Sequence, residues 1–461
     1  SSHLCSELLA CIPKGMAKKM RLPNLPPCDP EAMRLDKETL QNHSAANARQ
    51  IAMGYMPGVA ECAVKDNRLI YVDIRGYQDK EFNAKMSEKS LFRCHSMTKP
   101  ITAVALMSLW EEGKLALDDP VHKYIPAFRN MKVLRAGRLE DAKRPITLRH
   151  LVMHTSGLGY GPSRERKTEK LEDGPYLPLV KRIDSGLIKN LKSFCNELAK
   201  FPLQFHPGDR WEYSMGLDVI GRVLEVVSGL PLDRLFRQRI FRKMGMKDTA
   251  FSVSPRKARR QLTAYYITKV RSKNRRTKLP NNFFTRRADG CHPKMSAWVQ
   301  GRSLKVLSGG GICGSFAGGL LSSLRDQTIF CNVLLNQGFA TTTGHQVLKP
   351  NTVRLLCRDW LRMKSVSDKQ KLRGWGMGRD VGWCPLGHWM PKERLMFMGG
   401  ITTNWSINFP TKTFQVSMTS SSCEADVHNW DDRKDDLSGA LDHAEKVWRR
   451  KRRLQNGRVS C

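Results

Sequence analysis

Segments with the pattern of β-strands lie at both ends of this chain, and a long region of helical pattern separates them. Near the start, residues 58–77 (GVAECAVKDNRLIYVDIRGY) alternate apolar and polar side chains across the turn residues KDN, which predicts a β-hairpin. Three more segments of strand type, residues 394–400, 404–410 and 413–420, come late in the chain. We therefore expect an α+β fold with one antiparallel sheet that is built from both chain ends and flanked by helices.

The region between these strands is predicted to be helical, with proline and glycine at the breaks. Residues 216–229 (GLDVIGRVLEVVSG) carry apolar side chains at three- and four-residue spacing, which is typical of a helix with one buried face. An inserted all-helical subdomain over about residues 117–300 is therefore expected. Further helices are predicted at about 31–52, 146–157, 231–245 and 436–453, and another begins at Ser96.

With 461 residues, of which 40% are hydrophobic, the chain is long enough to bury a large core. We predict a proline-dotted surface extension over residues 1–30, one domain over 31–425, and a basic helix and tail over 426–461 that complete it. The longest apolar runs are far shorter than the roughly 20 residues that span a bilayer. The first residue is not methionine, and the apolar part of residues 1–20 is too brief to identify as a signal peptide.

The chain is strongly basic, with 78 lysines and arginines against 43 aspartates and glutamates and a formal charge of +35. The excess is spread over separate clusters at residues 254–261, 269–278 and 448–458, which we interpret as solvated loops and a solvated helix end. No nucleic-acid reader motif accompanies the charge, so no specific nucleic-acid partner is expected. A weak contact of the basic surface with an anionic membrane or an acidic partner stays open. The sequence does not indicate an oligomeric state.

The chain has thirteen cysteines, without CxxC pairs or a regular spacing. This pattern favours reduced thiols over a disulfide framework or a zinc site, and no metal is expected. Reduced thiols favour the cytoplasm, while an organelle stays open.

The stretch CHSMTKP, residues 94–100, contains the first candidate for chemistry. Residues three apart share one face of a helix, so Lys99 can place its amine near the hydroxyl of Ser96. Pro100 fits the first turn of a helix, where backbone N–H groups have no intrahelical partner. A serine and a lysine at this spacing are also compatible with a helix cap beside a surface lysine, and the spacing alone does not decide.

Five ordered blocks of sequence decide between these interpretations. They are residues 91–126, 146–161, 205–251, 308–338 and 397–409, and together they resemble the serine β-lactamase and penicillin-binding-protein superfamily. The closest similarity is to its class C and family VIII esterase branch, whose S-x-x-K signature matches Ser96 and Lys99. The resemblance implies the serine β-lactamase-like fold and a serine hydrolase that needs no cofactor.

The resemblance also implies roles for individual residues. Ser96 is expected to be the nucleophile that becomes acylated, and Lys99 the base that takes its proton, because a serine hydroxyl is inert at its free pKa. Tyr213 matches the tyrosine that helps to activate the serine and protonates the leaving group. The backbone N–H groups of Ser96 and Ile401 are expected to form the oxyanion hole, with Gly399 and Gly400 along the substrate edge. An ordinary bulge in a strand is the alternative for the two glycines.

Two positions depart from the β-lactamase pattern. Met215 stands where class C enzymes have an asparagine that holds a β-lactam amide, and Met398 replaces the lysine of the third motif. Both changes make β-lactams and peptidoglycan-like substrates less suitable. We therefore expect a small ester or similar acyl compound as substrate, with the acyl group passed to water or to an alcohol. A β-lactamase or D-Ala-D-Ala carboxypeptidase and a scaffold without turnover are the alternatives.

Several other features have weaker links to chemistry. His154 and His206 occupy positions that are usually structural in this superfamily, and the glycine run at 308–314 lacks the ending of a phosphate-binding loop. The sequence GSFAGG at 314–319 resembles an insertion beside the site mouth. Four late tryptophans could line an acyl pocket, although core packing is the favoured interpretation for Trp375, Trp383, Trp389 and Trp405.

Overall fold

A computed structural model of the chain provides the structure. It describes residues 24–52, 56–80, 82–159, 176–260, 265–267, 284–286, 319–361, 381–400, 403–419, 421–422 and 436–457. Within these residues, the largest sheet has eight antiparallel strands in the order β12-β13-β14-β15-β16-β1-β2-β3. Their bounds are β1 (Gly58–Lys65), β2 (Arg68–Asp79), β3 (Ala84–Lys85), β12 (Gly382–Cys384), β13 (Gly387–Met390), β14 (Leu395–Gly399), β15 (Thr403–Asn408) and β16 (Thr413–Thr419).

The predicted sheet from both chain ends is confirmed, because β1 pairs directly with β16, from Val59 opposite Thr419 to Lys65 opposite Thr413. The predicted hairpin is also present as β1 and β2. Its turn residues Asp66 and Asn67 have φ values of 46° and 57°. Asp and Asn tolerate this left-handed conformation, which a two-residue hairpin turn of the favoured twist requires.

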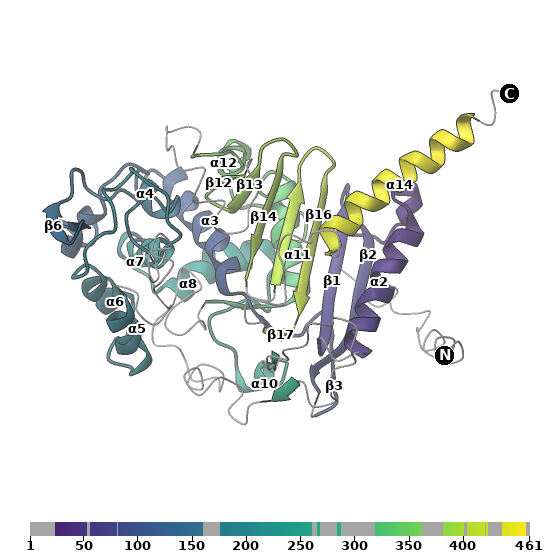
Figure 1. Cartoon of the computed structure of the whole chain (residues 1–461), viewed down its shortest axis with the longest axis horizontal. Helices are drawn as coiled ribbons and strands as arrows, with labels where there is room; N and C mark the ends of the chain where they lie inside the picture. Colours follow the sequence, from purple (N-terminus) through teal and green to yellow (C-terminus); the bar gives the residue numbers. More distant parts are fainter. Residues whose placement is uncertain are drawn as a thin grey trace.

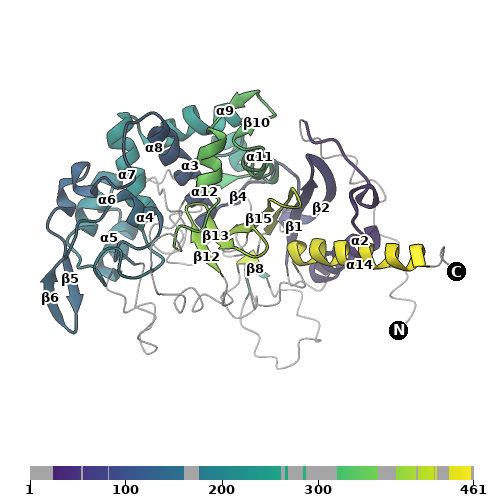
Figure 2. The same cartoon turned by 90° about the horizontal axis from the view of Figure 1, so that it is seen from above.

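Helices cover both faces of this sheet. Helix α11 (Leu324–Leu335) packs on one face, where Phe330 contacts Trp405 and Thr328 is hydrogen-bonded to Cys62 at 3.0 Å. Helices α2 (Lys37–Ala52) and α14 (Leu437–Gly457) lie side by side on the opposite face (Figure 1; Figure 2). Helices from near the start and from the end of the chain therefore cover the same face of the sheet.

The first helix starts later than the sequence pattern predicts. It was expected from about residue 31, whereas residues Pro30–Met33 form a separate 3-10 turn, η2, and α2 begins at Lys37. Arg34 ends the turn with a φ of 62°, which no residue inside a right-handed helix adopts.

The insertion between the two parts of the sheet contains a cluster of helices, shown at the left of Figure 1. Helix α7 (Gly216–Ser228) lies at its centre, as its apolar face predicts, and packs against its neighbours α3, α4, α6 and α8. The other bounds are α3 (Thr98–Glu111), α4 (Leu148–Val152), α5 (Leu177–Asp184), α6 (Leu191–Leu198), α8 (Leu232–Phe236), the π-turn η7 (Arg237–Phe241), α9 (Arg242–Met244) and α10 (Pro255–Ala258).

A hairpin that the sequence pattern did not predict also belongs to this insertion. Strands β5 (Lys132–Arg135) and β6 (Arg138–Asp141) are mostly exposed, so they lack the alternation of apolar and polar residues that marks a half-buried strand. Figure 2 places the hairpin at the end of the molecule opposite α14.

The remaining elements are short. They are η3 (His95–Met97), η4 (Val121–Lys123), η5 (Pro126–Phe128), α12 (Pro350–Leu356), and the strands β4 (Phe92–Arg93), β7 (Tyr265–Ile267), β8 (Phe284–Arg286), β9 (Leu321–Ser322), β10 (Phe339–Ala340), β11 (His345–Gln346) and β17 (Ser421–Ser422). Each cysteine of the described residues is a free thiol. In the same part of the chain, no helix has the length and apolar character that crossing a bilayer requires.

Candidate active site

Ser96 and Lys99 lie together where the chain enters helix α3. Ser96 belongs to the 3-10 turn η3, which runs directly into α3, and Lys99 is in the first turn of the helix. The Lys99 amine donates a hydrogen bond of 3.2 Å to the Ser96 hydroxyl. The alternative of a helix cap is wrong, because the cap position of α3 is Met97 and Ser96 makes no capping bond there.

The surroundings of Lys99 suit a base. The side chain is buried in the core, with the residue 2% exposed, and burial disfavours the charged ammonium. Burial lowers the pKa of Lys99 from the usual 10.5 to about 7, and the negative charge of Asp218 opposes part of this shift. A substantial fraction of the amine is therefore neutral near pH 7 and can accept a proton.

Asp218 was not among the residues that the sequence indicated. It lies in the first turn of α7, which packs against α3, and it is 1% exposed. Its position five residues after Tyr213 was visible, but nothing in the sequence showed that α7 would bring a carboxylate within electrostatic reach of Lys99.

Tyr213 comes from the segment before α7 and joins the serine and the lysine. A hydrogen bond links the Tyr213 side chain to Ser96, and the Lys99 amine lies over the Tyr213 ring at 4.6 Å from its centroid. Burial raises the pKa of Tyr213, the bond to Ser96 opposes this, and the charge of Asp218 adds to it. The tyrosine is therefore a neutral phenol at neutral pH, able to donate a proton, whereas Lys99 is the better base.

Gly399 ends strand β14, and Gly400 follows it beside the turn that carries Ser96. A Cβ atom on Gly400 would lie 2.7 Å from the Cys94 carbonyl oxygen and 2.6 Å from the Thr403 hydroxyl oxygen. Because real Cβ atoms do not approach so closely, only glycine lets the strand end touch the nucleophile turn. The alternative of an ordinary bulge does not explain this approach.

Of the two expected oxyanion donors, the structure describes the N–H of Ser96, and it also describes the N–H of Gly400, which precedes the second donor. The Gly400 N–H donates to the Thr403 carbonyl oxygen at 2.6 Å and is thus already used. The N–H of Ser96 belongs to the first turn of a helical segment, where N–H groups have no intrahelical acceptor. Ile401 lies outside the described residues.

Both methionines that depart from the β-lactamase pattern are buried. Met215 caps the start of α7, and Met398 lies in β14 opposite Trp405. Neither side chain can bind a carboxylate or an amide carbonyl as lysine or asparagine would.

Of the histidines and tryptophans that the sequence singled out, some lie beside Tyr213 and others lie elsewhere. His154 lies beside Tyr213, with ring centroids 4.6 Å apart, whereas His206 pairs with Glu140 at 3.1 Å elsewhere in the insertion. Trp383 belongs to the core and contacts Tyr213 at 5.8 Å between centroids. Trp405 is also buried in the core, Trp389 is partly buried, and Trp375 and the glycine run 308–314 lie outside the described residues.

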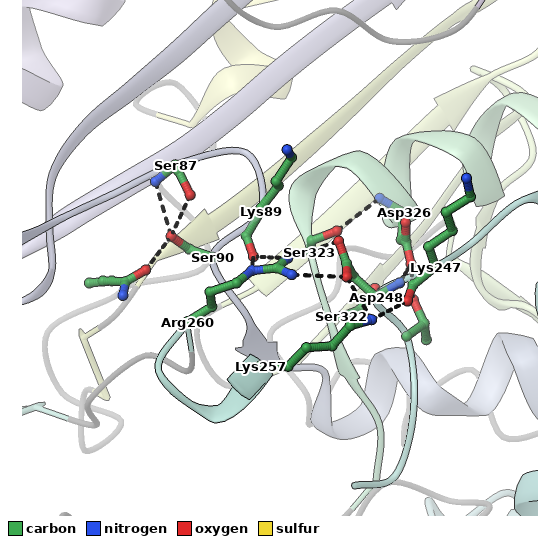
Figure 3. A network of polar contacts seen from close by, with 12 residues as sticks. Ser87, Lys89, Ser90, Lys247, Asp248, Lys257, Arg260, Ser322, Ser323 and Asp326 are labelled. Atoms are coloured by element: carbon green, nitrogen blue, oxygen red, sulfur yellow. Dashed lines mark hydrogen bonds and ion pairs between the residues drawn. The ribbon is translucent and has the colours of Figure 1, made fainter. Parts of the chain in front are cut away.

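A polar network anchors the strand pair that precedes the nucleophile turn, and Figure 3 shows Asp248, Ser322 and Asp326 of this network. The buried carboxylate of Asp326 accepts hydrogen bonds from the Asp248 N–H and the Thr249 hydroxyl, both near 2.8 Å. Thr249 in turn contacts Ser322 at 2.8 Å, and Ser322 lies in β9, which pairs with β4 just before Ser96. The turn is therefore held by a strand pair with a fixed polar anchor.

Among the described residues, no group of three or more His, Cys, Asp or Glu side chains is arranged to bind a metal ion.

Comparisons with known proteins show what the whole chain is similar to. An uncharacterised protein of Mycobacterium tuberculosis is 32% identical over 376 residues, which are 78% of this chain and 82% of that protein. Esterase EstB of Burkholderia gladioli is 34% identical over 229 residues, 48% of this chain and 54% of EstB. The solved structure of EstCE1, a hydrolase with promiscuous acyltransferase activity, is 24% identical and has a TM-score of 0.61, with 84% of this chain and 94% of EstCE1 covered.

The sequence pattern of the Beta-lactamase family matches residues 44–431. The resemblance inferred from the five sequence blocks and the expected fold are thereby confirmed. Since the match spans most of the chain, this protein belongs to the Beta-lactamase family and is a serine hydrolase of that superfamily.

Proposed function

We propose that the protein is a carboxylester hydrolase or acyltransferase that forms an acyl-enzyme on Ser96. The observation that carries the proposal is the buried hydrogen bond of 3.2 Å between the Lys99 amine and the Ser96 hydroxyl. It provides a nucleophile and a base in the same water-poor place, which covalent catalysis by serine requires.

The proposed acylation step uses the three buried side chains in turn. The neutral Lys99 amine takes the Ser96 proton while the Ser96 oxygen attacks the ester carbonyl carbon. The carbonyl oxygen becomes an oxyanion that backbone N–H groups stabilise, with that of Ser96 as one donor. When the carbon–oxygen bond to the alcohol breaks, the departing oxygen takes the proton of the Tyr213 hydroxyl, and the Lys99 ammonium returns a proton to Tyr213.

Deacylation uses the same groups in reverse. A water molecule or an alcohol gives its proton to the Tyr213 oxygen as it attacks the acyl-Ser96 carbonyl carbon, while the Tyr213 proton passes to the neutral Lys99 amine. The Lys99 ammonium then gives a proton to the departing Ser96 oxygen, which is released as a hydroxyl. Hydrolase and transferase differ here only in the acceptor. The similarity to esterase EstB supports the ester as substrate class.

The nature of Met215 and Met398 supports a neutral acyl substrate. Without a cation or an amide at these positions, the carboxylate of a β-lactam or of a peptidoglycan stem would have to be desolvated with no compensating bond, which costs several kcal/mol. β-Lactamase or D-Ala-D-Ala carboxypeptidase activity remains the second enzymatic candidate, and hydrolysis of nitrocefin distinguishes it.

The test combines an active-serine probe with a substrate series. The purified protein is incubated with a fluorophosphonate probe and with p-nitrophenyl esters from acetate to decanoate, in parallel with Ser96→Ala. We expect serine-dependent labelling and ester turnover in the wild type, and a loss of at least about 10²-fold in Ser96→Ala, because a covalent catalyst without its nucleophile loses orders of magnitude. Lys99→Met should likewise suppress the acylation burst.

The outcomes separate the candidates. Residual turnover above about a tenth of the wild-type rate in Ser96→Ala would move the nucleophile to another residue. Labelling without turnover would indicate a missing acceptor alcohol. A folded protein that neither labels nor turns over any ester would be the scaffold that the sequence left as an alternative.

A further inference from the structure

His154 holds the chain on both sides of Tyr213. The Glu212 N–H donates to the His154 carbonyl oxygen at 2.8 Å, and the Ser214 N–H donates to the His154 ring nitrogen Nδ1 at 3.1 Å. The two anchors enclose the tyrosine in the sequence, and the His154 ring packs against the Tyr213 ring at 4.6 Å between centroids. His154 itself is fully buried.

This arrangement requires one protonation state of the ring. Because Nδ1 accepts a backbone N–H, it carries no proton, and the proton of a neutral imidazole is then on Nε2. Burial lowers the pKa of His154 well below its usual value, and the nearby charges of Lys99 and His388 lower it further. The ring is therefore a neutral acceptor throughout the pH range in which Lys99 can act as a base.

The other side of His154 is fixed to helix α4. Its N–H donates to the Leu151 carbonyl oxygen at 3.3 Å, and its backbone has a φ of 58°. Gly216, at the start of α7, approaches the same part of α4 so closely that a Cβ atom would lie 2.5 Å from the Leu151 carbonyl oxygen. The segment that carries Tyr213 thus lies beside the end of α4, and its backbone is hydrogen-bonded to His154 both before and after the tyrosine.

We propose that His154 is a positioning residue, which orients the Tyr213 hydroxyl toward Ser96 and toward the departing oxygen of the substrate. The inference rests on the proposed function, since it assigns His154 to the step in which Tyr213 gives its proton to the leaving alcohol. Without these two backbone hydrogen bonds the Tyr213 side chain would be free to shift. A displacement of its hydroxyl by about 1 Å is enough to weaken proton transfer.

The distinguishing measurement is the dependence of the rate on the leaving group. A p-nitrophenolate leaves as a stable anion, whereas an alkoxide must be protonated as it leaves. We therefore compare kcat/KM for p-nitrophenyl acetate and ethyl acetate in the wild type, Tyr213→Phe, His154→Leu and His154→Asn. A general acid contributes about 10²-fold to 10⁴-fold, so Tyr213→Phe sets the scale of the effect on the alkyl ester.

We expect His154→Leu to lose about 10²-fold on ethyl acetate and less than about 10-fold on p-nitrophenyl acetate. His154→Asn should recover most of the loss, because Asn carries an acceptor oxygen at the place of Nδ1 and tolerates a positive φ. His206→Leu is the matched control, since His206 is also buried in the insertion but pairs with Glu140 and is not bonded to the Tyr213 segment. It should change both esters by the same factor.

A double variant tests whether His154 acts through Tyr213. If it does, His154→Leu combined with Tyr213→Phe is no slower on ethyl acetate than Tyr213→Phe alone, because the orientation of a missing hydroxyl has no effect. Equal losses of His154→Leu on both esters, or additive losses in the double variant, would overturn the proposal.

Failure of the proposed function is recognised separately. If the wild type turns over neither ester, crystal structures of His154→Leu and His154→Asn decide the positioning role by themselves. The hydrogen bond between Tyr213 and Ser96 should be lost in the leucine variant and kept in the asparagine variant. An unchanged Tyr213 in the leucine variant would contradict the assignment, whatever the substrate.

Discussion

At the scale of single residues, one lysine determines the pH range of the chemistry. The Lys99 amine must be neutral to accept the Ser96 proton, and burial lowers the pKa of Lys99 to about 7. The rate of acylation should therefore rise with pH through about 7. Tyr213 has its pKa raised by burial and is a protonated donor over the same range. The environment of the two side chains thus assigns base and acid to different residues.

Asp218 sets the position of this pH dependence. Its negative charge raises the pKa of Lys99 against the larger opposing effect of burial. Removing the charge in Asp218→Asn should lower that pKa, so the rising limb of the profile of kcat/KM against pH should move to lower pH. The measurement is the pH profile with p-nitrophenyl acetate between about pH 5 and 9.

The control for Asp218→Asn is Asp233→Asn, which removes an equal charge from an exposed position in α8. It should leave the profile in place. A profile of Asp218→Asn that stays in place or moves to higher pH would show that the carboxylate does not act on Lys99.

At the scale of elements, buried charges join α2 to the sheet. His43 of α2 contacts Glu61 of β1 at 3.1 Å, and Asn47, one turn later, donates to Glu61 and to Asp73 of β2. Burial alone would lower the pKa of His43, but the hydrogen bond to Glu61 and the charges of Glu61 and Asp73 outweigh it, so the pKa is raised. The contact of helix and sheet is thus strongest while His43 is charged.

This contact predicts a pH-dependent stability. A His whose pKa is raised on folding stabilises the protein fully below the unfolded pKa, near 6.5, and the contribution is lost as the pH rises through the folded pKa. Between about pH 6 and pH 9, the free energy of unfolding of the wild type should fall by about 1 kcal/mol more than that of His43→Gln. Urea unfolding at both pH values measures the difference.

His345→Gln is the matched control, because His345 is exposed in β11. It should follow the wild type at both pH values. A wild type that loses no more stability than His43→Gln over this range would mean that His43 is not charged in the folded protein.

At the scale of the whole molecule, the excess of basic residues works against folding. The formal charge is +35, so the basic side chains repel one another in the compact state. Single surface ion pairs, such as Arg449 with Glu445, contribute only about 0–1 kcal/mol each to the free energy of unfolding. Part of the excess lies on the exposed end of α14, which extends away from the sheet in Figure 1. Self-repulsion among the basic residues therefore opposes folding, and an isolated exposed pair offsets little of it.

Salt should consequently stabilise this protein. Raising the ionic strength from about 0.01 M to about 0.15 M shortens the Debye length from about 30 Å to about 8 Å and screens the repulsion. We expect the midpoint of thermal unfolding, Tm, to rise by about 2 °C or more, since about 1 kcal/mol shifts the Tm of a large domain by a few degrees. Sucrose of equal osmolality is the control for effects other than screening, and a Tm that falls with added salt would contradict the expectation.

Much of the fold was accessible from the sequence because its signals are local. The hairpin at Asp66 and Asn67, the buried face of α7 and the late strands all depend on side-chain periodicity or turn chemistry within a few residues. The hairpin β5–β6 and the late start of α2 escaped prediction, since exposed strands lack alternation and a single left-handed residue, Arg34, ended the first turn.

The sequence by itself determined the family and the sheet that is built from both chain ends. It also determined the pairing of Ser96 with Lys99, because residues that are three apart in a helix lie next to each other on its surface. Tertiary structure alone decided how the site is tuned. Only the packing of α7 on α3 placed the Asp218 charge near Lys99. Only the packing of the Tyr213 segment beside α4 let His154 bind the residues before and after Tyr213, Glu212 and Ser214. Burial and charge act through space, and no spacing in the chain encodes which distant residues will share one low-dielectric interior.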